Sequence, residues 1–188
     1  MIILASKSPR RHELLKKVVD KFEIIPANIN EDEIEASTNE LAMKISQMKA
    51  YKIAATHPND LVLAVDTIVV LGDTVFGQPE SPEHAKWMLH QLSGQTHHVI
   101  SGFTIIDPDH EISRSVVTTV TFNELSDKMI DAYVATGEPQ GKSGSYGIQD
   151  IRSKKYNFVK SVDGSVDNVV GLPTEELLKF KHLFEKNR

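Results

Sequence analysis

Residues 1–17 read MIILASKSPRRHELLKK, and this stretch combines the patterns of a strand, a tight loop and a helix. The run IILA at 2–5 does not alternate between apolar and polar side chains, so it predicts a short strand buried on both faces. Ser8 is a favourable N-cap and Pro9 suits the first helical turn, so we expect a helix to follow. A helix that begins at the carboxyl end of a buried strand is typical of ligand sites in α/β sheets.

Two adjacent arginines, Arg10 and Arg11, occupy the first turn of this expected helix. Cations at the positive end of a helix dipole repel each other unless an anion lies between them, and the arginine fork matches phosphate oxygens. One interpretation is therefore a phosphate site. The other is a pair of solvated surface arginines beside an ordinary cap, and these residues alone leave both open.

Strand and helix patterns alternate along the rest of the chain. Strands are expected at 22–26, 61–71, 97–107, 111–122 and 157–165, and helices at 39–55, 81–94, 126–137 and from near Pro173 onward. The third and fourth of these strands flank a DPDH turn and predict a hairpin. The helix expected at 39–55 has an apolar stripe through Leu41, Ile45, Met48 and Ile53, and a turn and a loop are expected at 72–79. These patterns predict a mixed α/β fold with one central, partly antiparallel sheet.

The composition is that of a globular protein and narrows the function classes. At 188 residues with 40% hydrophobic and 25% charged side chains, the chain is long enough for a real core. Its formal net charge of -5 disfavours nucleic-acid binding. The sequence has neither a membrane-spanning segment nor a signal-peptide pattern, so no membrane partner is expected. The absence of cysteine excludes disulfides and thiolate catalysis, and a cytoplasmic location fits.

Asp66 is the most unusual acid in the sequence, because it lies in the middle of the apolar run LVLAVDTIVVL at 61–71. A carboxylate in a buried strand is costly unless it is paired or binds a metal. Its position therefore indicates a functional acid. The alternative is that the strand kinks at this place and the aspartate caps a nearby group.

Other charged residues carry weaker signals. The acids at 31–33 could supply a second metal carboxylate, or they form a solvated loop. Lys49 is one of several lysines on its expected helix, where a solvated face is the ordinary interpretation. Lys142 lies in the glycine-rich loop EPQGKSGSYG, whose backbone N–H groups could cradle a phosphate. No P-loop or dinucleotide-binding glycine motif occurs in the sequence.

Seven segments, taken in order, resemble the Maf family of nucleoside triphosphate pyrophosphatases. They are LASKSPRRHELL, Lys49-Ala50, LAVDTIVVL, GQPESPEHAKWML, LSGQTHHVISG, EPQGKSGSYGIQ and NVVGLPTEEL. The resemblance covers nearly the whole chain and implies a single domain over 1–188. It implies an α/β fold like that of the inosine triphosphate pyrophosphatases, with an elongated mixed central sheet, flanking helices and two lobes around a deep cleft. It also implies hydrolysis of a nucleoside triphosphate to the monophosphate and pyrophosphate with a divalent metal, Mg²⁺ or Mn²⁺, and suggests a homodimer.

The resemblance also implies roles for individual residues. Ser8 and Arg10, with Arg11 close by, are expected to hold the phosphate chain, and Lys49 to neutralise its charge. Lys142 is expected to add to substrate binding.

Asp66 matches the family's proposed general base, which activates the attacking water. An aspartate beside a metal and phosphates would stay ionised, so Asp66 is also a candidate metal ligand. Glu31 falls in the segment where the family uses a further acid, with Asn30 as the alternative for that place.

Substrate selection follows from which branch of the family the chain resembles. Arg10, Thr67 and Gln149 match the branch active on dTTP and UTP rather than the branch active on 7-methyl-GTP. A glutamine amide both donates and accepts hydrogen bonds, so Gln149 suits the edge of uracil.

Three positions depart from the family pattern. Gln78, expected to bind substrate, stands where a lysine implicated in catalysis is usual in the family, Gly141 replaces an aspartate and Asp150 replaces a glycine. The loss of a cation at position 78 gives some support to an alternative, a nucleotide-binding regulator of septum formation and cell division with little catalysis. The second alternative is a 7-methyl-GTP pyrophosphatase.

Overall fold

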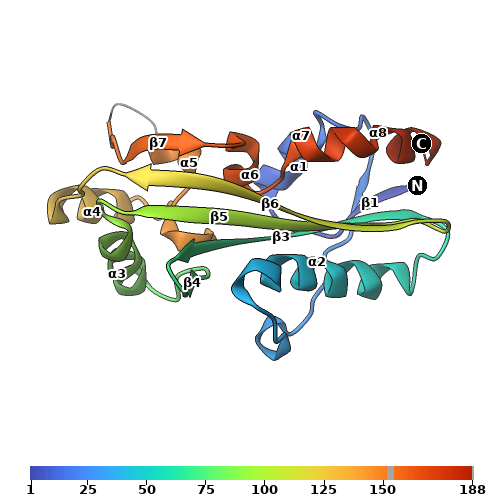
Figure 1. The fold of residues 1–188 in the computed structure, drawn as a ribbon, viewed down its shortest axis with the longest axis horizontal. Helices are drawn as coiled ribbons and strands as arrows, with labels where there is room; N and C mark the ends of the chain where they lie inside the picture. The colour runs from blue at the N-terminus through green and yellow to red at the C-terminus, as the bar shows by residue number, and fades with distance from the viewer. Residues whose placement is uncertain (152–154, 188) are drawn as a thin grey trace. The chain divides into compact units, whose positions relative to one another are not determined.

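The computed structural model describes residues 1–151 and 155–187, and its seven strands form one mixed sheet (Figure 1). The strand order is β2-β1-β3-β5-β6-β7, with β4 paired to β3. The pairs β1–β2 and β1–β3 are parallel, whereas β3–β4 and β6–β7 are antiparallel, which confirms the predicted mixed α/β class. The strands are β1 (Ile2–Leu4), β2 (Glu23–Ile24), β3 (Leu61–Leu71), β4 (Thr74–Phe76), β5 (Thr96–Ile106), β6 (Glu111–Phe122) and β7 (Val159–Asp163).

The predicted helices are present, with ends shifted by a few residues. The last predicted helix begins directly after Pro173, but it is divided by a 3₁₀ turn into α7, η3 and α8. The α-helices are α1 (Pro9–Leu15), α2 (Thr38–Ala54), α3 (Pro82–Leu92), α4 (Asp127–Val134), α5 (Ile148–Ile151), α6 (Val166–Val170), α7 (Thr174–Leu177) and α8 (Lys181–Lys186), and the 3₁₀ helices are η1 (Glu31–Glu33), η2 (Ser143–Ser145) and η3 (Leu178–Phe180). Neither α5 nor α6 was predicted, because four or five residues are too few to show a helical period.

The chain forms two compact units. Unit 1 comprises Met1–Thr67, Ser101–Val116 and Gly171–Arg188, and unit 2 comprises Ile68–Ile100 and Val117–Val170. The strands β3, β5 and β6 contribute residues to both units. None of the helices in the described part of the chain is both long and apolar enough to cross a membrane.

In unit 1, α2 packs closely against the sheet through small side chains. Ala50 and Ile53 of α2 join Ile3 of β1 and Val62 and Ala64 of β3 in one buried cluster. The predicted apolar stripe of α2 was partly wrong. Met48 is 49% exposed, and Ala42 is buried in its helix instead. A helix that lies this close to a strand needs small residues at the contact, which a pattern of large apolar side chains does not reveal.

The predicted loop at 72–79 was also partly wrong, because it contains β4. Gly72 adopts a φ of +58° and, with Asp73, forms the two-residue turn of a tight hairpin between β3 and β4. Leu71 pairs with Thr74 across that turn. A Gly-Asp pair between apolar segments was therefore an available hairpin signal.

In unit 2, α3 and α4 lie side by side (Figure 1, green and yellow-brown helices). Both begin at a serine whose side chain caps the helix. Ser81 accepts from the backbone N–H of His84, and Ser126 accepts from that of Met129, as the sequence predicted for Ser81. The core of this unit contains buried aromatic residues, with Tyr133, Tyr146 and Phe158 among them.

Candidate active site

Asp66 lies on β3 in unit 1 and is 8% exposed. Lys49 on α2 donates from Nζ to Oδ1 of Asp66 at 2.8 Å. The same ammonium lies 2.7 Å from Oε1 of Glu31, which belongs to η1. The expectation that a buried carboxylate must be paired is confirmed. The ordinary interpretation of Lys49 as part of a solvated face is wrong, because its side chain is 12% exposed.

The surroundings of Asp66 favour its neutral form more than those of a surface aspartate. Burial raises the pKa of Asp66, and the nearby cations Lys49 and Arg11 offset this increase only in part. A carboxylate with a raised pKa takes up a proton more readily, which suits a general base. Titratable groups perturbed in this way gather at active sites, so the geometry supports a catalytic role.

Glu31 and Asp66 also form a donor set that fits a divalent metal. Their oxygens Oε1 and Oδ1 lie 2.7 and 2.8 Å from one nitrogen, so both carboxylates are directed at a common point. Mg²⁺ and Mn²⁺ prefer carboxylate oxygens, usually one or two of them together with phosphate oxygens. Their chemistry suits such a metal, but the Lys49 ammonium lies at their common point, so metal binding by Glu31 and Asp66 stays a prediction.

Arg11 bends away from α1 and is held by acceptors of the chain itself. Its Nε donates to the carbonyl oxygen of Gly171 at 2.8 Å, Nη1 to Oγ of Ser6 at 3.2 Å, and Nη2 to Oγ1 of Thr67 at 3.0 Å. Burial lowers the pKa of Arg11 from its ordinary value, and nearby Asp66 acts in the opposite direction. The interpretation of Arg11 as a solvated surface residue is wrong, because its guanidinium is partly buried and donates to three protein oxygens. Its part in phosphate binding stays a prediction.

Thr67, next to Asp66 on β3, is fixed from two sides. Its Oγ1 accepts from Arg11 and lies 2.8 Å from Oγ of Ser101, a fully buried residue of β5. Gly171 closes the network with a φ of +126°, a conformation that favours glycine. The residue that the sequence assigned to pyrimidine selection is therefore held by Arg11 and Ser101.

Ser8 and Arg10 lie at the start of α1, as predicted. Ser8 occupies the N-cap position with extended backbone angles, and its N–H donates to Oγ of Ser6 at 3.3 Å. The capping bond predicted for the Ser8 hydroxyl is wrong, because this side chain caps none of the helix amides in the described part of the chain. Both Ser8 and Arg10 are partly exposed, and their contact with phosphate remains a proposal.

The remaining predicted binding residues belong to unit 2. Gln78 follows β4 and Gln149 lies on α5, and both are exposed. Lys142 is buried and forms ion pairs of 2.8 Å with Glu138 and with Asp150.

The expectation that loop amides around Lys142 cradle a phosphate was wrong for three of them. The N–H groups of Gly144, Ser145 and Gly147 donate instead to the carbonyls of Gly77 and Lys142 and to the hydroxyl of Tyr133, respectively. These contacts fold the loop onto its own unit.

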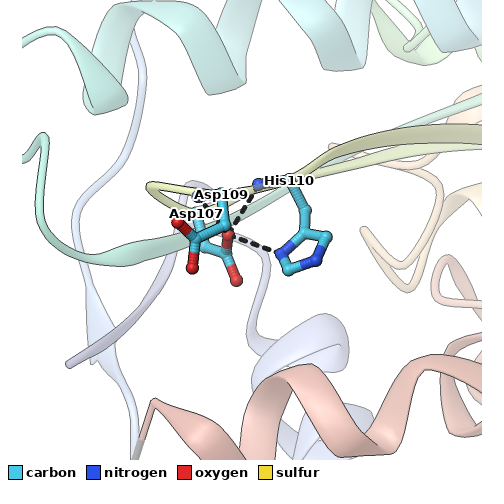
Figure 2. A group of neighbouring side chains, drawn as sticks. All are labelled: Asp107, Asp109 and His110. Carbon is cyan, nitrogen blue, oxygen red and sulfur yellow. Dashed lines mark hydrogen bonds and ion pairs between the residues drawn. The ribbon is translucent and has the colours of Figure 1, made fainter.

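A second group of metal-type ligands lies in the turn between β5 and β6 (Figure 2). Oδ1 of Asp107 accepts from the backbone N–H groups of Asp109 and His110 and lies 2.9 Å from Nδ1 of His110. Burial raises the pKa of Asp107, but these hydrogen bonds outweigh it and the pKa is lowered overall. Lys186 forms an ion pair with Asp109 at 2.6 Å. The protein's own donors thus satisfy the cluster, which serves as the turn of the hairpin.

Sequence reasoning missed Ser6 and Ser101, which hold the two ends of the Arg11 network. It also missed the pairing of Asp150 with Lys142. Ser6 lies where the first strand runs into the loop before α1, and a small polar residue close to two arginines was an available signal. Ser101 is far from Thr67 in the sequence, so only the strand pairing of the fold brings the two hydroxyls together.

Comparison with known proteins identifies relatives over nearly the whole chain. Residues 1–182 match the family described as Maf-like protein. Among curated relatives, the dTTP/UTP pyrophosphatase of Pyrococcus furiosus is 43% identical over 98% of this chain and 96% of the relative. The protein of the same name from Thermosipho africanus is 44% identical over 94% and 89%, respectively. Among solved structures, the Ham1 protein of Staphylococcus aureus is 16% identical, with a TM-score of 0.45 over 67% of this chain and 72% of that one.

Proposed function

Because the chain belongs to the Maf family, we propose that it hydrolyses dTTP and UTP to the nucleoside monophosphate and pyrophosphate. The observation that carries this proposal is the buried pair of Asp66 and Lys49, joined at 2.8 Å and completed by Glu31. It provides a proton acceptor, a cation and a second carboxylate within one unit. Two relatives that are 43% and 44% identical to this chain, and that align over nearly their full length, are named dTTP/UTP pyrophosphatase.

In this mechanism Asp66 accepts the proton of the attacking water. Its raised pKa brings it nearer to the pH at which it works, and Lys49 keeps it ionised and correctly oriented. Ser8 and Arg10 bind the phosphate chain, which the arginine fork contacts through two oxygens. A divalent metal held by Glu31 and Asp66 would supply charge neutralisation of the triphosphate.

Selection of the base is assigned to Thr67 and Gln149, together with Arg10. Arg11 and Ser101 fix the Thr67 side chain, so that its hydroxyl presents one arrangement to a substrate. The Gln149 amide reads the uracil or thymine edge by donating and accepting hydrogen bonds. Gln78 contributes a neutral amide to phosphate binding, and Lys142 contributes through the loop that it holds.

The test is a nucleotide panel with the purified protein and Mg²⁺ or Mn²⁺, in which pyrophosphate and the nucleoside monophosphate are measured. We expect kcat/KM to be highest for dTTP and UTP. A preference for 7-methyl-GTP would contradict the proposed substrate. Nucleotide binding without turnover would contradict the proposed hydrolysis and favour a regulatory protein. We also propose that the enzyme is cytoplasmic, because these nucleotides occur in the cytoplasm. We further propose that it is a homodimer, and light scattering of the purified protein tests this.

A further inference from the structure

A connected group of polar side chains in unit 2 surrounds the segment that carries Gln149. The buried ammonium of Lys142 donates to Oε2 of Glu138 and to Oδ2 of Asp150, both at 2.8 Å. The same Oδ2 lies 3.4 Å from the hydroxyl of Tyr133, which donates to it. The Tyr133 oxygen in turn accepts from the backbone N–H of Gly147 at 3.1 Å.

These contacts hold the backbone on both sides of Gln149. The Asp150 carboxylate folds back onto the start of the segment, so that a Cβ placed on Gly147 would lie 2.6 Å from Asp150 Oδ2. The N–H groups of Asp150 and Ile151 both donate to the carbonyl of Gly147, at 3.0 and 3.2 Å. Gln149 itself is exposed within this tight turn. Its backbone is therefore restrained while its amide faces outward.

The charges of the group argue for a structural use of Lys142. One ammonium is shared by two carboxylates, so its positive charge is more than offset within the unit. Lys142 is 8% exposed and Tyr133 is fully buried, and burial raises the pKa of Tyr133 well above its ordinary value. The hydroxyl accordingly stays protonated and able to donate to Asp150. Buried and fully satisfied polar groups of this kind rigidify the backbone they touch.

A rigid amide is what discrimination between pyrimidines requires. Uracil presents an N–H donor and a carbonyl acceptor, whereas cytosine presents the reverse pattern at the same places. A glutamine that can turn its amide around satisfies both bases, and one held in a single orientation satisfies only one.

We propose that Asp150, Lys142 and Tyr133 form a clamp that fixes the backbone from which the Gln149 amide reaches the base, and that this clamp contributes to the preference for UTP over CTP. This inference rests on the proposed function, because it concerns the base selected by the same enzyme. Within the clamp Asp150, Lys142 and Tyr133 are positioning residues that act through Gln149. The clamp also defines a role for Asp150, one of the departures from the family pattern.

The experiment measures kcat/KM for UTP and for CTP in the wild type and in Asp150→Asn, which keeps the size of the side chain and removes its charge. We expect the UTP to CTP ratio to fall about tenfold in the variant, mainly through a higher KM for UTP and a lower KM for CTP. Hydrogen exchange of the amides at 147–151 should become faster without any nucleotide present. Tyr133→Phe, which removes the acceptor for the Gly147 amide, should shift both readouts in the same direction.

A double variant separates positioning from general damage. In a Gln149→Ala background, Asp150→Asn should leave the UTP to CTP ratio unchanged, because the amide that it positions is gone. The matched control is Asp131→Asn, which replaces a carboxylate in an exposed ion pair with Lys86 in the same unit. We expect this control to keep both the wild-type ratio and the wild-type exchange rates.

Two results would overturn the clamp while leaving the proposed function intact. One is an unchanged UTP to CTP ratio in Asp150→Asn, and the other is a further fall of the ratio when Asp150→Asn is added to Gln149→Ala. A wild-type protein that releases no pyrophosphate from dTTP or UTP would instead overturn the proposed function, and this inference with it.

Discussion

The ammonium of Lys49 lies 2.8 Å from Oδ1 of Asp66, so the buried acid of β3 has a cation from α2 as its direct partner. The ammonium keeps the carboxylate ionised and so limits how far burial raises the pKa of Asp66. The balance between burial and the nearby cation sets the pH at which Asp66 is able to accept a proton.

Replacing Lys49 with methionine should move the acid limb of the activity profile. Without the ammonium, burial raises the pKa of Asp66 further, so the fall of kcat/KM on acidification should occur at a higher pH than in the wild type. The readout is the midpoint of the acid limb for UTP hydrolysis, because the absolute rate also reflects lost phosphate neutralisation. An acid limb that keeps its midpoint would show that Asp66 is not the group that titrates.

Replacing Arg11 with lysine should destabilise unit 1. A lysine cannot reproduce the three directions in which the guanidinium donates, to Gly171, Ser6 and Thr67. We expect the free energy of unfolding to fall by about 1–3 kcal/mol, measured by urea denaturation. The matched control is Arg114→Lys, at an exposed arginine of the same unit, for which a change below about 1 kcal/mol is expected. Equal losses in the two variants would show that the Arg11 network does not stabilise the fold.

Gly102 should tolerate no side chain. A Cβ there would lie 2.2 Å from the backbone nitrogen of Met43 and 2.3 Å from the carbonyl carbon of Ala42, both on α2. Because backbone cannot move aside as a flexible side chain does, Gly102→Ala should cost about 3 kcal/mol or more of stability. Gly77→Ala is the control, since its Cβ would meet no atom of the described residues within 4 Å. Similar thermal midpoints for the two variants would contradict the close packing of α2 on β5.

The buried His97 should make the protein sensitive to acid. Burial lowers its pKa from 6.5 to about 3, so between these values the unfolded chain binds a proton that the folded chain does not. Stability is therefore lost as the pH falls below 6.5, by about 2 kcal/mol at pH 5 from this residue alone. His97→Gln should show a flatter decline between pH 7 and 5 in denaturant titrations. The exposed control His182→Gln should keep the wild-type slope, and a wild-type slope in His97→Gln as well would refute the assignment.

The sequence was sufficient to predict the elements with strong patterns. The strand at 61–71, the Ser81 cap of α3 and the position of Pro9 in the first turn of α1 follow from local chemistry, and the structure has them at those places. The pairing of Asp66 was also predictable in kind, because a buried carboxylate needs a partner.

The hydrogen-bond partners of some side chains were not predictable, because the fold brings together residues that are far apart in the sequence. Arg11 donates to Gly171, which lies 160 residues away in the sequence, and Ser101 reaches Thr67 across neighbouring strands. The tight approach of α2 to Gly102 depends on backbone geometry that side-chain patterns do not encode.

The most direct test of the account compares wild type with Asp66→Asn at saturating UTP and Mg²⁺, with UMP and pyrophosphate quantified together and nucleotide affinity measured by calorimetry. The variant retains the shape of the side chain and loses its ability to accept a proton. We expect equal amounts of UMP and pyrophosphate from the wild type, and a rate in Asp66→Asn lower by about three orders of magnitude with binding retained. A variant that turns over UTP at a rate close to that of the wild type, or a wild type that forms UDP and phosphate instead, would contradict this expectation.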